Sequence, residues 1–167
     1  LENNRTAALA GWFDFLRFPS VGTDPAHLAD CTACAAWLRD WLAPLGFQVE
    51  FLGAPDVPPV VYATRRSPDP AAKTVMIYGH YDVQPADPLD LWESDPWTPT
   101  QRGDRVYARG AQDDKGQVWW MLQGVRAAIE TGAAMPNLLL VLEGQEECGS
   151  ASLTRIVESD SARFRAD

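Results

Sequence analysis

The sequence predicts an α/β domain with a mixed, mostly parallel sheet flanked by helices. Segments with the apolar spacing of helices alternate along the chain with short strand-like segments, the order found in layered α/β folds. Residues 137–142 form a continuous apolar run, as expected of a central strand covered on both faces. The chain has 167 residues, 46% of them hydrophobic, which suffices for one packed core.

Two amphipathic helices are predicted at the start of the chain. Over residues 5–18 the apolar side chains recur at the i, i+3, i+4 and i+7 positions of a helix, and Pro19 ends it. Asp24 followed by Pro25 is typical of a helix cap and first turn. The helix that they begin is expected to end before Gly46.

Three strands are predicted next. Residues 47–51 alternate between apolar and polar, as in a strand with one buried face. Residues 60–64 and 74–78 are separated by a polar turn containing proline, and we expect them to pair as a hairpin, which makes the sheet mixed. The stretch 75–83 is interpreted as a buried strand that ends at Gly79.

Residues 84–104 form a long connection that is rich in proline and contains Trp92 and Trp97. Structureless loops of this length are uncommon and usually functional. Two compatible interpretations are an Ω-loop packed on its own aromatic residues and one wall of a substrate cleft. Residues 105–108 are predicted to be a short strand.

Two further helices complete the predicted elements. One begins at Asp113 or Asp114 and runs to about Thr131, with apolar residues at helical spacing and a glycine at its end. The last begins at Ser150 or Ser152, after the apolar run of the central strand.

Composition excludes several function classes. The net charge of −9 disfavours nucleic-acid binding, which needs clustered Lys and Arg, and no apolar run is long enough to span a membrane. Three cysteines argue against a disulfide framework and favour a reducing compartment, the cytoplasm. Cys31 and Cys34 form a C-x-x-C pattern, which marks redox or metal sites, but two small buried side chains on a helix are the favoured interpretation.

Ionisable side chains gather where predicted strands end and a helix begins. These residues are His80, Asp82, Glu143, Glu146 and Glu147 after two strands, and Asp113 and Asp114 at a helix N-terminus. Singly, each has a structural explanation, such as a satisfied histidine, a helix cap or a solvated turn. Together, close carboxylates repel one another unless a cation lies among them. Imidazole and carboxylates without thiolates suit zinc or a similar divalent ion.

Three motifs in this order resemble the co-catalytic zinc metallohydrolases. They are GHYDVQP (79–85), RGAQDDKG (109–116) and EGQEECGS (143–150). That family includes carnosine-type dipeptidases, aminoacylases, glutamate carboxypeptidases, acetylornithine deacetylases and succinyl-diaminopimelate desuccinylases. The W-x-x-D-P-W-x-P segment at 92–99 resembles the dipeptidase branch most. Small departures are Ala108, where glycine commonly precedes Arg-Gly, and Cys148, where isoleucine often follows the paired glutamates.

The resemblance implies a role for five residues. His80 would ligate one zinc ion, Asp82 would orient its imidazole, Asp113 would bridge both ions, Glu147 would ligate the second, and Glu146 would be the general base. The implied cofactor is two zinc ions, with Mn²⁺ or Co²⁺ as substitutes. The implied reaction is zinc-dependent hydrolysis of a dipeptide or short peptide by an activated water.

The resemblance also implies that the site extends beyond residues 1–167. Another carboxylate and a final histidine are expected further downstream, and the residues after Glu147 contain no histidine. We therefore expect an N-terminal portion of the catalytic domain, without the lid or dimerisation domain and the C-terminal part. Alone it should bind zinc incompletely and be inactive. The whole enzyme is expected to take small peptides and to form a homodimer through the lid domain.

Two alternatives remain open. One is a deacylase or desuccinylase of the same family, which would use the same chemistry on an N-acyl amino acid. The other is a non-catalytic metal-binding module. Glu146 argues against the module, because a site that only held metal would need no general base beside its ligands.

Overall fold

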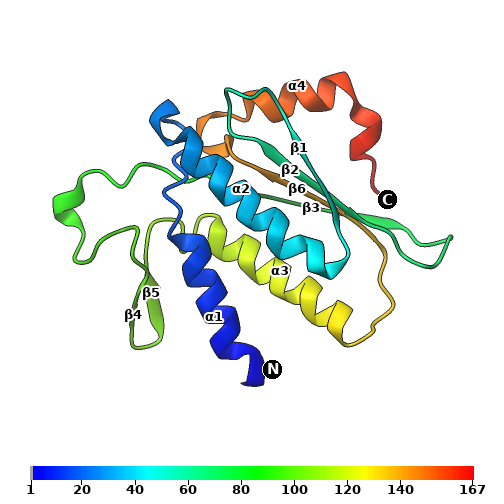
Figure 1. Ribbon diagram of the computed structural model, residues 1–167, viewed down its shortest axis with the longest axis horizontal. Coiled ribbons are helices and arrows are strands. Elements are labelled where there is room, and N and C mark those ends of the chain that lie inside the picture. The colour runs from blue at the N-terminus through cyan, green and yellow to red at the C-terminus, as the bar shows by residue number, and fades with distance from the viewer. Residues whose placement is uncertain (1) are drawn as a thin grey trace.

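The computed structural model describes residues 2–167 and has three layers (Figure 1). Three helices cover one face of a four-stranded sheet, and one covers the other face. The α-helices are α1 (Glu2–Leu16), α2 (Leu28–Leu42), α3 (Lys115–Glu130) and α4 (Ala151–Ser159). Short 3₁₀ turns are η1 (Pro25–His27), η2 (Ala43–Leu45), η3 (Leu89–Leu91), η4 (Glu146–Cys148) and η5 (Ser161–Phe164).

The main sheet has the strand order β1-β2-β6-β3. Its strands are β1 (Gln48–Leu52), β2 (Val60–Arg65), β3 (Thr74–His80) and β6 (Asn137–Glu143). The pairings β1–β2 and β2–β6 are antiparallel, and β3–β6 is parallel. The predicted α/β class with a mixed sheet is therefore confirmed, but antiparallel pairing predominates among the described strands, so the expected parallel majority is wrong.

The expected hairpin between β2 and β3 is also wrong, because β6 lies between them. The side chains of β6 explain its central place. Leu138 to Leu142 are at most 4% exposed, and a strand that is apolar on both faces must be covered on both. The chain therefore crosses from β2 to β3 past the position of β6, a strand that comes later in the sequence.

Burial along β3 differs from the prediction. As the outer strand of the sheet it leaves Val75, Met76 and Tyr78 between 43% and 47% exposed. Only its C-terminal end is buried, where His80 is 6% exposed. The prediction that this whole stretch is buried is therefore wrong, because the apolar pattern of a strand does not show whether the strand lies at the edge of a sheet.

The core lies on both sides of β6. Leu138, Leu140 and Leu142 pack toward the three-helix face, while Leu139 and Val141 pack toward α4 and η5. Cys31 and Cys34 of α2 are fully buried free thiols in the larger cluster, as the apolar interpretation of that pair predicts. The alternation of β6 side chains thus holds both helical layers against one strand.

Helix termini follow the sequence signals. The Asp24 side chain accepts a hydrogen bond from the Ala26 amide at 2.9 Å. Gly46 and Gly132 follow helices at φ of 84° and 69°, a conformation in which glycine avoids the steric cost of a side chain. The helix predicted from Asp113 or Asp114 begins at Lys115, directly after this pair.

The long loop carries a two-stranded sheet of β4 (Thr100–Arg102) and β5 (Arg105–Tyr107). Trp92 Nε1 donates to the Ala86 carbonyl at 2.8 Å, and the Arg109 guanidinium lies 5.5 Å from the centre of its ring. The loop therefore packs around its own Trp92, which agrees with the Ω-loop interpretation. A role as a cleft wall stays a prediction.

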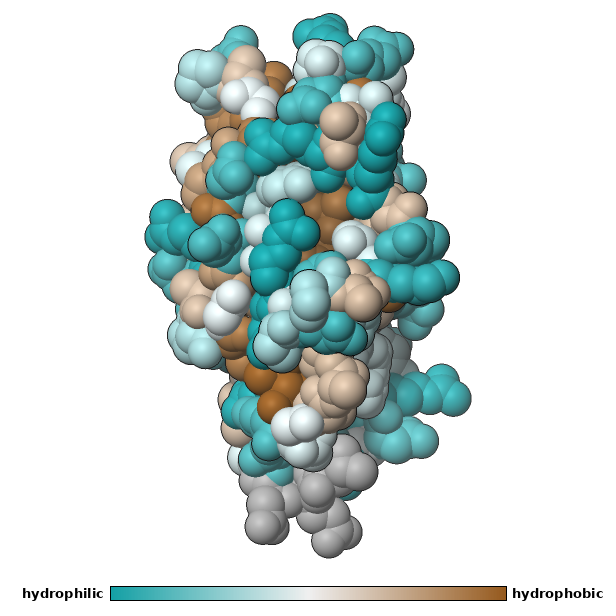
Figure 2. All heavy atoms as spheres, turned by 90° about the vertical axis from the view of Figure 1, so that its right-hand side faces the viewer, coloured by the Kyte–Doolittle hydropathy of each residue, from teal (hydrophilic) through white to brown (hydrophobic). Residues whose placement is uncertain are grey.

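The opposite end of the molecule carries the turn between β2 and β3 and the C-terminus. Figure 2 looks onto this end and shows hydrophilic residues over much of the face, with separate apolar areas between them.

Among residues 2–167, no helix has the length and hydropathy needed to cross a membrane.

Candidate metal centre

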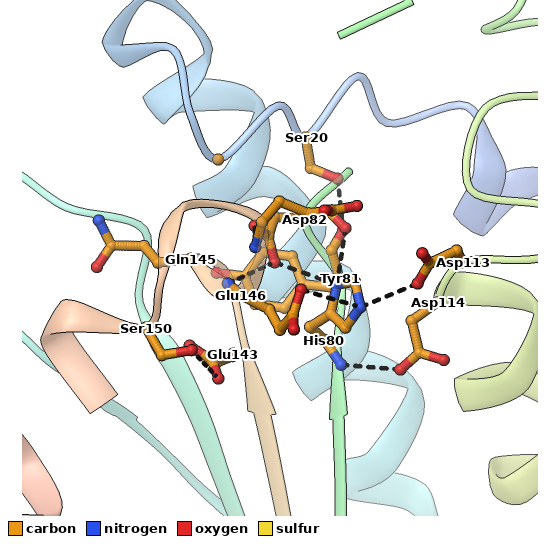
Figure 3. A network of polar contacts seen from close by, with 12 residues as sticks. Ser20, His80, Tyr81, Asp82, Asp113, Asp114, Glu143, Gln145, Glu146 and Ser150 are labelled. Atoms are coloured by element: carbon orange, nitrogen blue, oxygen red, sulfur yellow. Dashed lines mark hydrogen bonds and ion pairs between the residues drawn. The ribbon is translucent and has the colours of Figure 1, made fainter. Parts of the chain in front are cut away.

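The candidate site lies where β3 and β6 end side by side. The parallel register places His80 opposite Glu143, so the segments that follow both strands emerge at the same edge of the sheet. The N-terminus of α3 brings Asp113 and Asp114 to this edge (Figure 3). Ligand sites in α/β sheets form at such carboxyl ends.

His80 is the buried centre of the site. Its Nε2 lies 3.2 Å from Asp113 Oδ1 and 3.7 Å from Glu146 Oε2. Its Nδ1 lies 3.1 Å from the Asp82 carbonyl oxygen and 3.4 Å from Asp82 Oδ1. The imidazole is therefore held from its Nδ1 side, and Nε2 faces the carboxylates.

The charges around His80 shift its pKa. Burial by itself lowers the pKa, but the hydrogen bond and charge of Asp82, with the charge of Asp114, raise it to about 9. Burial raises the pKa of Asp114, whose Oδ2 accepts the His80 backbone amide at 3.1 Å. The ring thus lies in a strongly negative environment that favours a cation.

Asp82 links His80 to the paired glutamates. Its side chain is fully buried, and its two oxygens accept the backbone amides of Glu146 and Glu147 at 3.2 and 3.1 Å. One carboxylate therefore touches the imidazole and also fixes the turn that carries both glutamates. A Cβ at Gly22 would lie 2.6 Å from Asp82 Oδ2, so glycine allows the loop after α1 to close over this carboxylate.

The donor set fits a divalent metal ion. Ligand atoms of His80, Asp113 and Glu147 all lie within 4.8 Å of one another. The Asp113 side chain is 70% exposed, which leaves it open toward an ion. Two carboxylates beside an imidazole suit zinc, and a cation would relieve their repulsion. The structure thus brings together all three residues predicted to bind metal, and places Glu146 and Asp82 beside them.

Four hydrogen bonds near the site were not predicted. Gln84 Nε2 donates to Glu147 Oε2 at 2.9 Å and to the Glu147 carbonyl at 3.3 Å. Glu143 accepts hydrogen bonds from Tyr78 and Ser150. Sequence analysis placed Glu143 among the ionisable residues at the strand ends, but residue type alone did not indicate the hydrogen-bond partners of Glu143 or of Gln84.

Lys115 is a further unpredicted residue. It is fully buried, and its Nζ donates to the carbonyls of Phe15 and Phe18 at 3.1 and 2.7 Å. Burial lowers its pKa. Because Lys115 directly follows Asp114, these bonds attach the segment that carries Asp113 to the end of α1. The peptide bond between Asp113 and Asp114 is cis.

Comparison with known proteins identifies relatives of this chain. The family model for peptidase family M20/M25/M40 matches residues 76–167. A Cys-Gly metallodipeptidase of Candida albicans is 37% identical over 164 residues, covering 89% of this chain and 34% of that protein. A human Beta-Ala-His dipeptidase is 42% identical over 109 residues, covering 65% of this chain and 21% of that protein.

A solved structure shares the whole fold described above. Human carnosine dipeptidase 1 superposes with a TM-score of 0.89 at 30% identity, covering 98% of this chain and 37% of that chain. The chain therefore spans about a third, or less, of the length of the relatives that it matches.

Proposed function

The chain belongs to peptidase family M20/M25/M40, and from that premise we propose that it is part of a zinc-dependent dipeptidase. The observation that carries this proposal is the convergence of His80, Asp113 and Glu147, whose ligand atoms lie within 4.8 Å of one another. The names of the relatives, a Cys-Gly and a Beta-Ala-His dipeptidase, support a dipeptide as the substrate.

The side chains have distinct roles in this proposal. His80, Asp113 and Glu147 would hold zinc, with Asp113 able to contact two ions. When bound, zinc would supply a Lewis acid that polarises the peptide carbonyl. Glu146, whose Oε2 lies 3.7 Å from His80 Nε2, would accept a proton from the attacking water on a carboxylate oxygen and return it to the leaving amine.

Asp82 would position these groups without reacting itself. Its contact with Nδ1 leaves His80 Nε2 free to face a metal ion, and its two accepted amide bonds fix Glu146 and Glu147. Carboxylates that hold a ligating imidazole in this way raise its basicity and restrict its orientation.

We further propose that residues 1–167 are an N-terminal portion of the catalytic domain. The chain covers 34% of the Candida albicans relative and 37% of the human carnosine dipeptidase 1 chain. The remaining metal ligands, a lid domain and a homodimer interface would then lie in the rest of the protein. The three free cysteines suit a reducing compartment such as the cytoplasm.

The test uses the full-length protein, meaning the whole chain that its gene encodes, stripped of metal and reloaded with zinc. Its turnover is measured on Cys-Gly, β-Ala-His and other dipeptides beside N-acetyl and N-succinyl amino acids. We expect dipeptides to be preferred. A preference for N-acyl substrates would move the assignment to a deacylase of this family.

Glu146→Gln separates an enzyme from a binding module. Loss of the general base should lower kcat by about 10²–10⁴-fold while zinc stays bound. Glu158→Gln is the matched control, because Glu158 is exposed on α4 and should leave kcat unchanged. No turnover of any substrate by the zinc-loaded wild type would favour the non-catalytic module.

A further inference from the structure

Glu143 is a buried carboxylate that the proposed reaction does not use. It ends β6, is 1% exposed and lies opposite His80 in the parallel register. Its Oε1 accepts the Tyr78 hydroxyl at 2.6 Å and the Ser150 hydroxyl at 2.9 Å. Its Oε2 is buried and meets no donor among the residues that the structure describes.

This arrangement lowers the stability of the folded protein. A buried carboxylate loses its hydration, and an acceptor without a donor recovers none of that loss. An apolar side chain of similar size would pack there without the desolvation cost. The two bonds that Glu143 does accept therefore point to a need for position rather than for stability.

The two donors come from different elements. Tyr78 lies on β3, two residues before His80. Ser150 lies at the far end of the turn that carries Glu146 and Glu147, directly before α4. Glu143 thus joins the strand of the imidazole to the turn of the glutamates. Figure 3 shows its contact with Ser150.

Ser150 supports the same conclusion independently. Its φ is 55°, and it is the only residue other than glycine with a positive φ among the described residues. Glycine would adopt this conformation without steric cost, so a serine here is explained by its hydroxyl. Strained backbone of this kind persists where the surrounding structure requires it, often at functional sites.

We infer that Glu143 is a positioning residue that, through Tyr78 and Ser150, holds the Glu146–Glu147 turn against His80. Asp82 fixes the start of this turn by accepting the backbone amides of Glu146 and Glu147. Glu143 fixes the end of the turn by accepting the Ser150 hydroxyl. The inference rests on the proposed function, in which this turn supplies a metal ligand and the general base.

The decisive measurement is the zinc dissociation constant of the full-length protein, obtained by competition with a chromophoric chelator. Tyr78→Phe, Ser150→Gly and Glu143→Leu should each weaken zinc binding about 10-fold. Glu143→Gln keeps an oxygen that accepts both hydroxyls, so it should bind zinc within about threefold of wild type. Ser159→Ala is the control, because its hydroxyl contacts only the Ile156 carbonyl of α4.

Ser150→Gly separates positioning from simple stabilisation. Glycine relieves the positive φ, which offsets much of the loss of the hydroxyl donor. The melting temperature of the metal-free protein should therefore change little even though zinc binding weakens. If Ser150→Gly and Tyr78→Phe both bind zinc as wild type does, or if Glu143→Gln loses as much affinity as Glu143→Leu, the inference is wrong. The readout is independent of substrate, so a failure to cleave dipeptides would overturn the proposed function and leave this result intact.

Discussion

At the scale of single residues, Asp82 connects the imidazole of His80 to the turn that carries both glutamates. It is fully buried and contacts the His80 imidazole and the amides of Glu146 and Glu147. Asp82→Asn keeps the shape but places an amide NH₂ where one of these contacts needs an acceptor. We expect zinc affinity to fall about 10–100-fold, measured by chelator competition in the full-length protein.

The matched control is Asp104→Asn, because Asp104 is exposed in the turn between β4 and β5. It should leave zinc affinity unchanged. Wild-type affinity in Asp82→Asn would show that the carboxylate is dispensable for arranging the ligands.

Gln84 makes a smaller contribution of the same kind. Its amide donates to the Glu147 carboxylate at 2.9 Å from an exposed position, so the bond competes with water. Gln84→Leu removes the donor, and we expect zinc affinity to fall by less than in Asp82→Asn, about 3–10-fold, since exposed hydrogen bonds contribute about 1 kcal/mol. Gln101→Leu, whose amide contacts only Gly103, is the control. Equal affinities in both variants would remove Gln84 from the site.

At the scale of elements, Lys115 connects α3 to α1. Lys115→Met leaves the carbonyls of Phe15 and Phe18 without their donor, while it removes the cost of a buried ammonium. We expect a net loss of about 2–3 kcal/mol in the free energy of unfolding, measured by urea denaturation. Lys73→Met is the control, because Lys73 is exposed. A loss no greater than in the control would mean that the two Lys115 bonds contribute nothing measurable to the attachment of α1.

The buried face of α2 determines which thiols react. Burial raises the pKa of Cys31 to about 12 and also raises that of Cys34. Partial burial and the neighbouring carboxylates raise the pKa of Cys148 too, but its side chain is exposed to the reagent. At pH 9 a thiol with the pKa of Cys31 is about one-thousandth thiolate, the reactive form. Iodoacetamide should therefore label Cys148 at pH 7–9 and reach Cys31 and Cys34 only after unfolding, as mapped by mass spectrometry. Fast labelling of Cys31 in the folded protein would contradict the described packing.

Sequence patterns predicted most of the helices and strands, but not which strands lie next to one another in the sheet. The continuous apolar run of β6 correctly indicated a central strand, and helix caps such as Asp24 were found where expected. The hairpin of β2 with β3 and the full burial of β3 were wrong. Strand order depends on long-range contacts, so a local pattern cannot distinguish an edge strand from its neighbour.

The same limit applies to the site. His80, Asp113 and Glu147 were predicted from residue type and motif, and the structure brings their ligand atoms together. Tyr78, Glu143 and Ser150 were not predicted as a connected group, because their link runs through a side chain between two strands. Residue type identifies groups that can react, whereas the contacts that position them appear only when the strands are paired.

At the scale of the whole molecule, the described residues form one side of a proposed active site. The sheet, the three-helix layer and α4 give a packed frame whose carboxyl edge presents the imidazole and carboxylates. The chain covers 34% of the Candida albicans relative and 37% of the human carnosine dipeptidase 1 chain. We therefore propose that this edge supplies His80, Asp113 and Glu147 to zinc in the full-length protein.

The most direct test is a crystal structure of the zinc-loaded full-length protein with anomalous data collected at the zinc edge. We expect anomalous peaks within about 2.0–2.2 Å of His80 Nε2 and of carboxylate oxygens of Asp113 and Glu147. Zinc bound elsewhere, with these three side chains making no metal contact, would contradict this proposal.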